Sequence, residues 1–367
     1  MIKLENVTRY FGKTAAVSNL SLEVADGEVC VLIGPSGCGK TTTLRMINRL
    51  LEPSSGKLFV NGRDTSNVRP EELRRTIGYA IQGVGLFPHM TIAQNVAVVP
   101  ELLRWDKPRI AGRVEEMLTL VGLNAAEYGG KYPGELSGGQ AQRVGVARAL
   151  AADPPILLMD EPFGAVDPLT RTNLQIQFAR IQQKLRKTVI LVTHDLDEAI
   201  RLADRLAVME AGKLMQYGTP ETVLQRPANK FVHDFVGTDR ALKRLSRIGV
   251  RGFIRDAPSI NVSASMLEAS AACSDCQWIW VVDGARKLCG WLDRGMLDGA
   301  GTVESAVVPG GTEQIAIPDT ATLREALSRM LEQGFTNMPV VDDDGQFLGE
   351  IRMADIEKET SKGTSAP

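Results

Sequence analysis

Long apolar runs are absent from this sequence of 367 residues. The longest, such as VCVLIG from residue 29, are far shorter than the roughly 20 residues that a helix needs to cross a bilayer. The first residues, MIKLENVTRYFGK, contain no apolar stretch of the kind that makes a signal peptide. We therefore expect that any role at a membrane depends on another subunit.

Net charge is also nearly absent, because 42 basic residues are balanced by 44 acidic ones, which leaves −2 at pH 7. This balance gives no electrostatic reason to expect nucleic acid as the main partner. Cysteine is scarce and odd in number, five in all, which favours a reducing compartment over a disulfide framework. Cys273 and Cys276 form a single C-x-x-C, but no further ligands are spaced to complete a zinc site. We expect two buried thiols there.

Short apolar runs alternate with longer helical patterns over the first part of the chain, to about residue 235. Runs such as EVCVLIG, PPILLMDEP and KTVILVTHD show no polar alternation. They predict a mainly parallel sheet covered by helices on both faces, an α/β fold. Their polar residues come at the strand ends, where open α/β sheets place ligands.

The pattern of apolar and polar residues changes after a stretch that contains several Pro and Gly residues and the basic segment TDRALKRLSRIGV. Two similar units follow, and the second, around MPVVDDDGQFLGEI, clearly reads as strand, Asp-Gly turn and strand beside helices. This internal pair predicts a small α+β domain built by duplication. We expect domains at 1–236 and 251–357, a linker at 237–250 and a disordered tail at 358–367.

The stretch GPSGCGKT matches G-x-x-x-x-G-K-[ST] and lies between a predicted strand and a predicted helix. Its glycines let the backbone curl into a nest of N–H donors that binds phosphate. Lys40 is expected to reach the β- and γ-phosphates of a nucleotide, and Thr41 to offer a hydroxyl to Mg²⁺. The residues expected to bind the nucleotide here are Gly34, Pro35, Ser36, Gly37, Cys38, Gly39, Lys40, Thr41 and Thr42.

Polar side chains end two further apolar runs. Asp160 and Glu161 follow ILLM; Asp160 is suited to Mg²⁺, and Glu161 can polarise an attacking water. By themselves, two adjacent acids would more simply mark a strand end at the surface, but the phosphate loop favours the functional interpretation. His194 ends VILVTH and can contact a γ-phosphate, although a lone histidine is more often structural.

A second anion cradle opens at LSGGQ, where Ser137, Gly138 and Gly139 begin a predicted helix. Free N–H groups and the helix dipole favour an anion there. Nothing in the sequence requires this cradle to lie beside the phosphate loop. The simpler arrangement is a C2 pair of identical chains, in which each nucleotide contacts one chain's Lys40 and the other chain's Ser137.

Together these motifs resemble those of the ATP-binding-cassette (ABC) ATPase family, in the family's order. The resemblance implies a P-loop cassette with a helical subdomain that sandwiches Mg-ATP between two copies, with Lys40, Glu161 and His194 catalytic and Thr41, Gln82 and Asp160 at the metal. It further implies nucleotide contacts from a base-stacking Tyr10, from Gln82, from the signature residues Ser137, Gly138, Gly139 and Gln140, and from Asp167 in GAVDP.

The paired units resemble a tandem CBS domain. A cassette with this appendage is similar to the ATPase subunits of bacterial importers for glycine betaine, choline and related quaternary-amine osmoprotectants. IGYAIQGVGLFPHMTIAQNVAVVPELLRW is similar to the same subfamily where the membrane partner binds. The units depart from the adenosine-binding pattern, because Arg352 stands where a hydroxyl is usual, although Asp355 remains, and the first unit has Asp293 and Met296 at these positions.

The resemblance implies several partners: a second ATPase copy, two transmembrane permease subunits, and a periplasmic or lipid-anchored substrate-binding protein, with no nucleic acid. It also implies a peripheral position on the cytoplasmic face of the inner or plasma membrane.

Two alternatives from other classes stay open. One is a soluble cassette protein, which usually carries a second cassette or a coiled-coil insertion that this chain lacks. The other is a binding module with a vestigial ATPase, which the intact Lys40, Asp160, Glu161 and His194 disfavour. Import of another small solute is a third.

Overall fold

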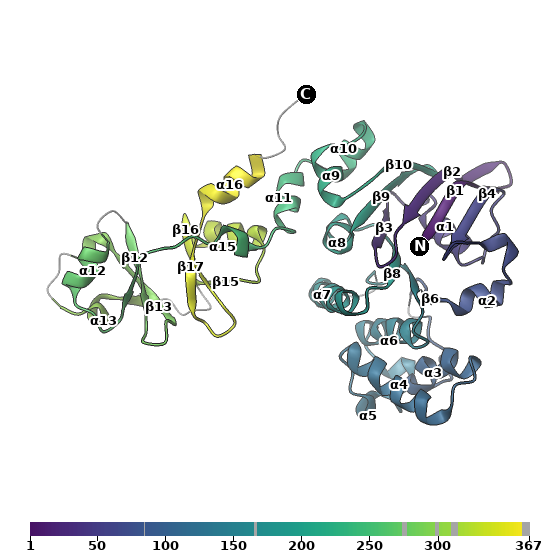
Figure 1. Ribbon diagram of the computed structural model, residues 1–367, viewed down its shortest axis with the longest axis horizontal. Helices are drawn as coiled ribbons and strands as arrows, with labels where there is room; N and C mark the ends of the chain where they lie inside the picture. Colours follow the sequence, from purple (N-terminus) through teal and green to yellow (C-terminus); the bar gives the residue numbers. More distant parts are fainter. Residues whose placement is uncertain (84, 165–166, 274–276, 298–300, 310–314, 362–367) are drawn as a thin grey trace. The chain divides into compact units, whose positions relative to one another are not determined.

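The computed structural model describes residues 1–83, 85–164, 167–273, 277–297, 301–309 and 315–361. The chain divides into two compact units, Met1–Gly237 (unit 1) and Thr238–Pro367 (unit 2), which Figure 1 colours by position in the sequence. No helix within the described ranges is both long and apolar enough to span a membrane.

Unit 1 is built on a six-stranded sheet in the order β10-β9-β3-β8-β7-β6. The strands β6, β7, β8, β3 and β9 run parallel, and β10 pairs antiparallel at one edge. This confirms the mainly parallel sheet predicted from the apolar runs. The strand bounds are β3 (Val29–Ile33), β6 (Ile77–Ala80), β7 (Ile156–Asp160), β8 (Thr188–Thr193), β9 (Arg205–Glu210) and β10 (Lys213–Gly218).

One face of this sheet is not covered by helices alone, so that prediction was wrong. An antiparallel sheet in the order β2-β1-β4-β5 and helix α1 (Lys40–Ile47) pack there against Cys30 and Leu32 of β3. The alternating apolar side chains of β1 supply the cover, since one apolar face of an antiparallel sheet buries a neighbour as a helix does. These strands are β1 (Ile2–Phe11), β2 (Thr14–Val24), β4 (Ser55–Val60) and β5 (Arg63–Asp64).

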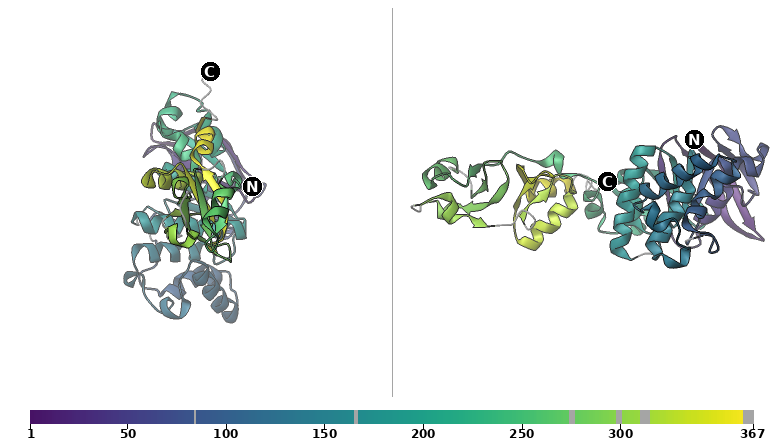
Figure 2. Two further views of the ribbon diagram at one scale, coloured as in Figure 1. Left: turned by 90° about the vertical axis from the view of Figure 1, so that its left-hand side faces the viewer. Right: turned by 90° about the horizontal axis from the view of Figure 1, so that it is seen from below.

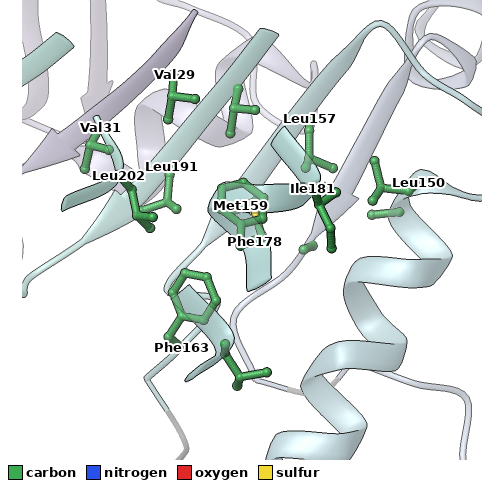
Figure 3. Close-up of a cluster of buried hydrophobic side chains, with 14 of the residues drawn as sticks. Val29, Val31, Leu150, Leu157, Met159, Phe163, Phe178, Ile181, Leu191 and Leu202 are labelled. Atoms are coloured by element: carbon green, nitrogen blue, oxygen red, sulfur yellow. The ribbon is translucent and has the colours of Figure 1, made fainter. Parts of the chain in front are cut away.

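Helices cover the opposite face. Figure 3 shows Phe163, Phe178, Ile181 and Leu202 packed beside the strand residues of this core, which include Met159 of β7. Helices α3 to α6 gather at one end of the unit as a helical subdomain (Figures 1 and 2). The helices of unit 1 are α2 (Pro70–Arg75), α3 (Ile92–Leu102), α4 (Lys107–Leu120), α5 (Ala125–Tyr128), α6 (Gly138–Leu150), α7 (Pro168–Leu185), α8 (Leu196–Leu202), α9 (Pro220–Gln225) and α10 (Lys230–Val236), with short 3₁₀ turns at η1 (Thr65–Asn67) and η2 (Pro133–Glu135).

Unit 2 contains a structural repeat. In each copy a short strand pairs parallel with a central strand, which pairs antiparallel with a third, and a helix follows the short strand. Both hairpins have a register shift at the same place, beside Gly290 in one and Gly349 in the other. The first copy comprises β11 (Ser259–Asn261), α12 (Met266–Ala272), β12 (Trp278–Val282), β13 (Leu288–Asp293), η4 (Arg294–Met296), α13 (Val303–Ala306) and β14 (Val308–Pro309), and the second comprises β15 (Ile317–Pro318), α15 (Leu323–Gln333), β16 (Asn337–Val341), β17 (Phe347–Arg352) and α16 (Met353–Ser361).

The segments flanking this repeat differ in detail from what the sequence suggested. The predicted linker, residues 237–250, contains α11 (Arg240–Leu245), and Leu245 and Val250 are buried in a core of unit 2, with η3 (Val250–Phe253) following. The predicted tail, residues 358–367, begins inside α16, and residues 362–367 lie outside the described residues. Cys273 is disulfide-bonded rather than a free thiol, and Cys276 lies outside the described residues.

Candidate functional site

The phosphate loop joins strand β3 to helix α1, and two of its glycines are required by close packing. Gly39 is the N-cap of α1 with φ 103°, and a Cβ there would lie 2.4 Å from the carbonyl oxygen of Ala16. A Cβ on Gly34 would lie 2.1 Å from the carbonyl oxygen of Met209. No side chain caps α1, so its first N–H groups are left for a ligand in the loop.

Lys40 lies inside this loop and is buried. Its Nζ donates to the carbonyl oxygens of Gly34 at 2.7 Å and Pro35 at 2.9 Å, and lies 3.6 Å from Cys38 Sγ. The ammonium therefore replaces lost hydration with bonds to its own loop. A phosphate oxygen offers it a charged acceptor, which makes a stronger hydrogen bond than a neutral carbonyl.

Thr41 and Asp160 meet at the end of β7. The Thr41 hydroxyl donates to Asp160 Oδ1 at 3.0 Å. Burial raises the pKa of Asp160 above its usual range, and the Thr41 hydroxyl acts in the opposite direction. A hydroxyl and a desolvated carboxylate side by side are hard oxygen donors that suit Mg²⁺, so the residues present fit the metal that the sequence predicts.

Glu161 is at the centre of a cluster of polar side chains. Gln82 Nε2 donates to its Oε2 at 3.3 Å, and His194 Nδ1 lies 3.2 Å from its Oε1. Glu161 has φ 48°, a left-handed conformation that is uncommon for a residue other than glycine. This turn directly after β7 brings the carboxylate beside two residues that are distant in sequence.

Most of these residues line one cavity of about 320 Å³, although the predicted site residues Gly34, Pro35, Cys38 and Asp160 are not part of its lining. The phosphate loop forms one side of it, and the polar cluster around Glu161 forms another. The lining residues are Ala16, Ser36, Gly37, Gly39, Lys40, Thr41, Thr42, Gln82, Glu161 and His194. Ala16, in β2, carries no functional group and matches no motif, so sequence reasoning had no signal by which to find it.

Other predicted site residues lie outside this cavity lining. Ser137 is the exposed N-cap of α6 in the helical subdomain, apart from α1 in Figure 1; its hydroxyl accepts from Gln140 N. Gly138 and Gly139 begin that helix, and Gln140 Oε1 accepts a hydrogen bond from Ser137 N. Tyr10 is 50% exposed on β1. Asp167 caps α7, while the preceding residues 165–166 lie outside the described residues.

Comparison with known proteins identifies the family. The ABC transporter family profile matches residues 17–164, and the CBS domain profile matches residues 312–361. The chain is 47% identical to the osmoprotectant import ATP-binding protein OsmV of Salmonella typhimurium, over 99% of this chain and 97% of that protein. The chain belongs to the ABC transporter ATP-binding proteins.

Two further relatives agree with this assignment. The glycine betaine/carnitine/choline transport ATP-binding protein OpuCA of Bacillus subtilis is 44% identical over 97% of this chain and 95% of its own length. The dimeric structure of the bacterial ABC transporter cassette MJ0796 aligns with a TM-score of 0.55 and 34% identity, over 60% of this chain and 98% of that one. This ABC protein is therefore an ATPase with a P-loop cassette and a C-terminal CBS domain.

Proposed function

We propose that this ABC ATPase supplies the energy for a bacterial importer of quaternary-amine osmoprotectants such as glycine betaine and choline. The observation that carries the proposal is that identity to such importers' ATP-binding proteins extends over 97–99% of this chain, through both units. A second identical copy, two transmembrane permease subunits and a periplasmic or lipid-anchored substrate-binding protein complete the proposed complex. The chain would then lie on the cytoplasmic face of the inner or plasma membrane.

In the proposed mechanism the phosphate loop and α1 bind the ATP phosphates, and Lys40 leaves its loop carbonyls for the β- and γ-phosphate oxygens. The other loop residues, from Gly34 to Thr42, supply backbone N–H groups and hydroxyls. Thr41 and Asp160, with Gln82, would hold Mg²⁺, which neutralises the charge that develops on the phosphates.

Glu161 would accept a proton from the attacking water, while His194 holds the carboxylate and the water in line. The contacts of Gln82 and His194 to the two carboxylate oxygens support this arrangement, because they orient Glu161 before any substrate binds. Hydrolysis would then release the charged γ-phosphate that held the two cassettes together, which would allow them to separate.

The remaining predicted contacts would come from the partner copy or the nucleotide base. Ser137, Gly138, Gly139 and Gln140 form a helix N-terminus that is not part of the Lys40 cavity, with Ser137 and Gly138 exposed. In a C2 dimer this N-terminus would face the partner's ATP, with Asp167 beside it. The dimeric cassette structures among the structural relatives support this geometry, and the exposed Tyr10 would stack on the adenine.

The proposed substrate class can be tested by uptake of labelled glycine betaine and choline at low and high osmolarity. In cells whose only copy carries Lys40→Ala, we expect osmotically stimulated uptake to fall about 100-fold, since a charge on the transferring phosphate is left without its partner. Lys57→Ala, at an exposed lysine of β4, is the matched control and should leave uptake unchanged. Normal uptake with an ATPase-inactive Lys40→Ala chain would contradict the proposed osmoprotectant substrates, but it would not contradict the ATPase activity.

The CBS domain is proposed to regulate the ATPase. Asp355 lines a cavity of about 420 Å³ in this domain, but its carboxylate is already paired. Arg255 already binds Asp355 through two hydrogen bonds, Nε to Oδ2 at 2.6 Å and Nη2 to Oδ1 at 2.7 Å. A bidentate pair of this kind competes with any ligand for the carboxylate.

Truncation after Gly237, where unit 1 ends, should preserve basal ATP turnover because each unit has its own core. We expect the truncated chain to lose the change of uptake with osmolarity. Turnover of the purified chain and uptake across a range of osmolarity are the measurements. An unchanged osmotic response would limit unit 2 to a packing role.

A further inference from the structure

A buried acidic residue lies close to the site but outside its lining. Glu198, on α8, is 4% exposed and follows His194 by four positions. Its Oε2 accepts from Gln175 Nε2 at 3.5 Å, whereas its Oε1 is buried with no hydrogen-bond partner in the described part of the chain. An ionised carboxylate is costly in such surroundings, so the geometry favours the neutral acid.

The electrostatics agree with this geometry. Burial, followed by the nearby charge of Asp195, raises the pKa of Glu198 to about 8. The Thr193 side chain acts in the opposite direction, followed by the charge of Arg171 on α7 and by the Gln175 side chain. Glu198 is therefore largely protonated at neutral pH and can hydrogen-bond without placing a second negative charge beside Asp195.

The turn that carries His194 is held on both sides by this group of residues. Asp195 N donates to Thr193 Oγ1 at 3.0 Å, and Glu198 N donates to Asp195 Oδ1 at 3.1 Å. Asp195 Oδ2 also pairs with Arg171 Nη1 at 3.5 Å. Arg171 and Gln175 are four residues apart and so share one face of α7, which means that α7 contacts Asp195 and Glu198 through this face.

Few contacts hold the His194 side chain in place. Its side chain is 62% exposed, and its hydrogen-bonding contact among the described residues is to Glu161. The position of its imidazole therefore depends on the backbone turn that Thr193, Asp195 and Glu198 hold.

We propose that Glu198 is a positioning residue for ATP hydrolysis, which holds the Thr193–Asp195 turn against α7 and so keeps His194 beside Glu161. This inference rests on the proposed role of His194. Ionisation of Glu198 would repel Asp195 and compete with it for Arg171. The turn would then loosen from α7, and His194 would lose its position without any change in the phosphate loop.

The test is the pH dependence of ATP turnover of the full chain. Wild-type turnover should fall above pH 8, approaching about tenfold for each further pH unit as the active neutral form is lost. Glu198→Gln keeps the size and hydrogen bonds of the neutral acid but cannot ionise, so it should match wild type at pH 7 and remain on the plateau at pH 9. The same fall in Glu198→Gln as in wild type would overturn the inference.

Three variants separate this inference, and the proposal on which it rests, from their alternatives. Asp197→Asn removes a charge from an exposed position of the same helix and should leave the wild-type pH profile. Glu198→Ala should lower kcat while KM for ATP is unchanged, because the phosphate loop is intact. A proportional loss of folded protein instead, measured by circular dichroism, would indicate a structural role only. His194→Ala tests the underlying proposal: full turnover in that variant would remove the role of His194, whatever Glu198 does.

Stability gives a measurement that does not depend on activity. Between the ordinary pKa of 4.5 and the folded value of about 8, folded Glu198 holds a proton that the unfolded chain has released. Wild-type stability relative to Glu198→Gln should therefore fall as pH rises through this window and level off above it. A difference that does not vary with pH would show that Glu198 is not neutral when folded, and would overturn the inference.

Discussion

Glu161→Gln is expected to bind ATP with wild-type affinity and to hydrolyse it about 10²–10⁴ times more slowly, the usual loss when a general base is removed. The amide has the size of the carboxylate, so the contacts to Gln82 and His194 can be kept. It cannot accept a proton from water. Single-turnover hydrolysis and equilibrium ATP binding, measured on the same preparation, separate the two effects.

The same variant tests the composite site. Because ATP is bound but not cleaved, an ATP-bound dimer should accumulate, and light scattering after size exclusion should detect it. Glu71→Gln, at an exposed position in the first turn of α2, is the matched control and should turn over ATP as wild type does. Glu161→Gln that stays monomeric with saturating ATP would contradict the proposed sandwich of nucleotide between two chains.

Ser137→Arg is expected to reduce hydrolysis by about 10²–10³-fold, the scale of removing a donor that stabilises developing charge. The long side chain would fill the exposed N-terminus of α6, which in the proposed dimer faces the partner's γ-phosphate. Monomer ATP binding should be nearly unchanged, because Ser137 is not part of the Lys40 cavity lining. ATP binding at protein concentrations too low for dimerisation, compared with turnover at high concentration, is the measurement.

Loss of a helix cap must be separated from loss of a partner contact. Ser137 shares a capping box with Gln140, and its removal costs about 1 kcal/mol of stability. Thr322→Arg breaks an equivalent capping box with Glu325 on α15 of unit 2 and should leave turnover unchanged. Loss of monomer ATP binding in Ser137→Arg would instead place the signature residues in their own chain's site.

The apolar runs predicted the central strands well, because a strand buried on both faces cannot carry polar side chains. β3, β7 and β8 lie where EVCVLIG, ILLMD and TVILVT stand, and all are fully buried. The cover of one sheet face was predicted incorrectly. Burial on both faces tells only that something apolar lies on each side, and here β1 and β2 share that role with α1.

Residues with a motif could be predicted from the sequence, and residues without one could not. Gln82, Glu161 and His194 follow three different strands, and the parallel order of β6, β7 and β8 brings the ends of those strands to one edge. Glu198 gave no signal, because an acid in the first turn of a helix is ordinary on a surface. Its burial against α7 makes it unusual, and that burial is a property of the packing.

By itself the sequence determined the chemistry that this protein can perform: a phosphate loop, a strand-end acid pair, a histidine and a second anion cradle, each readable because local backbone geometry demands particular residue types. Only the tertiary structure decided which of these lie together. It places Lys40, Thr41, Gln82, Glu161 and His194 around one cavity and leaves Ser137 exposed outside that lining. Local motifs depend on a few neighbouring residues, whereas proximity between distant motifs depends on strand order and burial, which no short stretch of sequence contains.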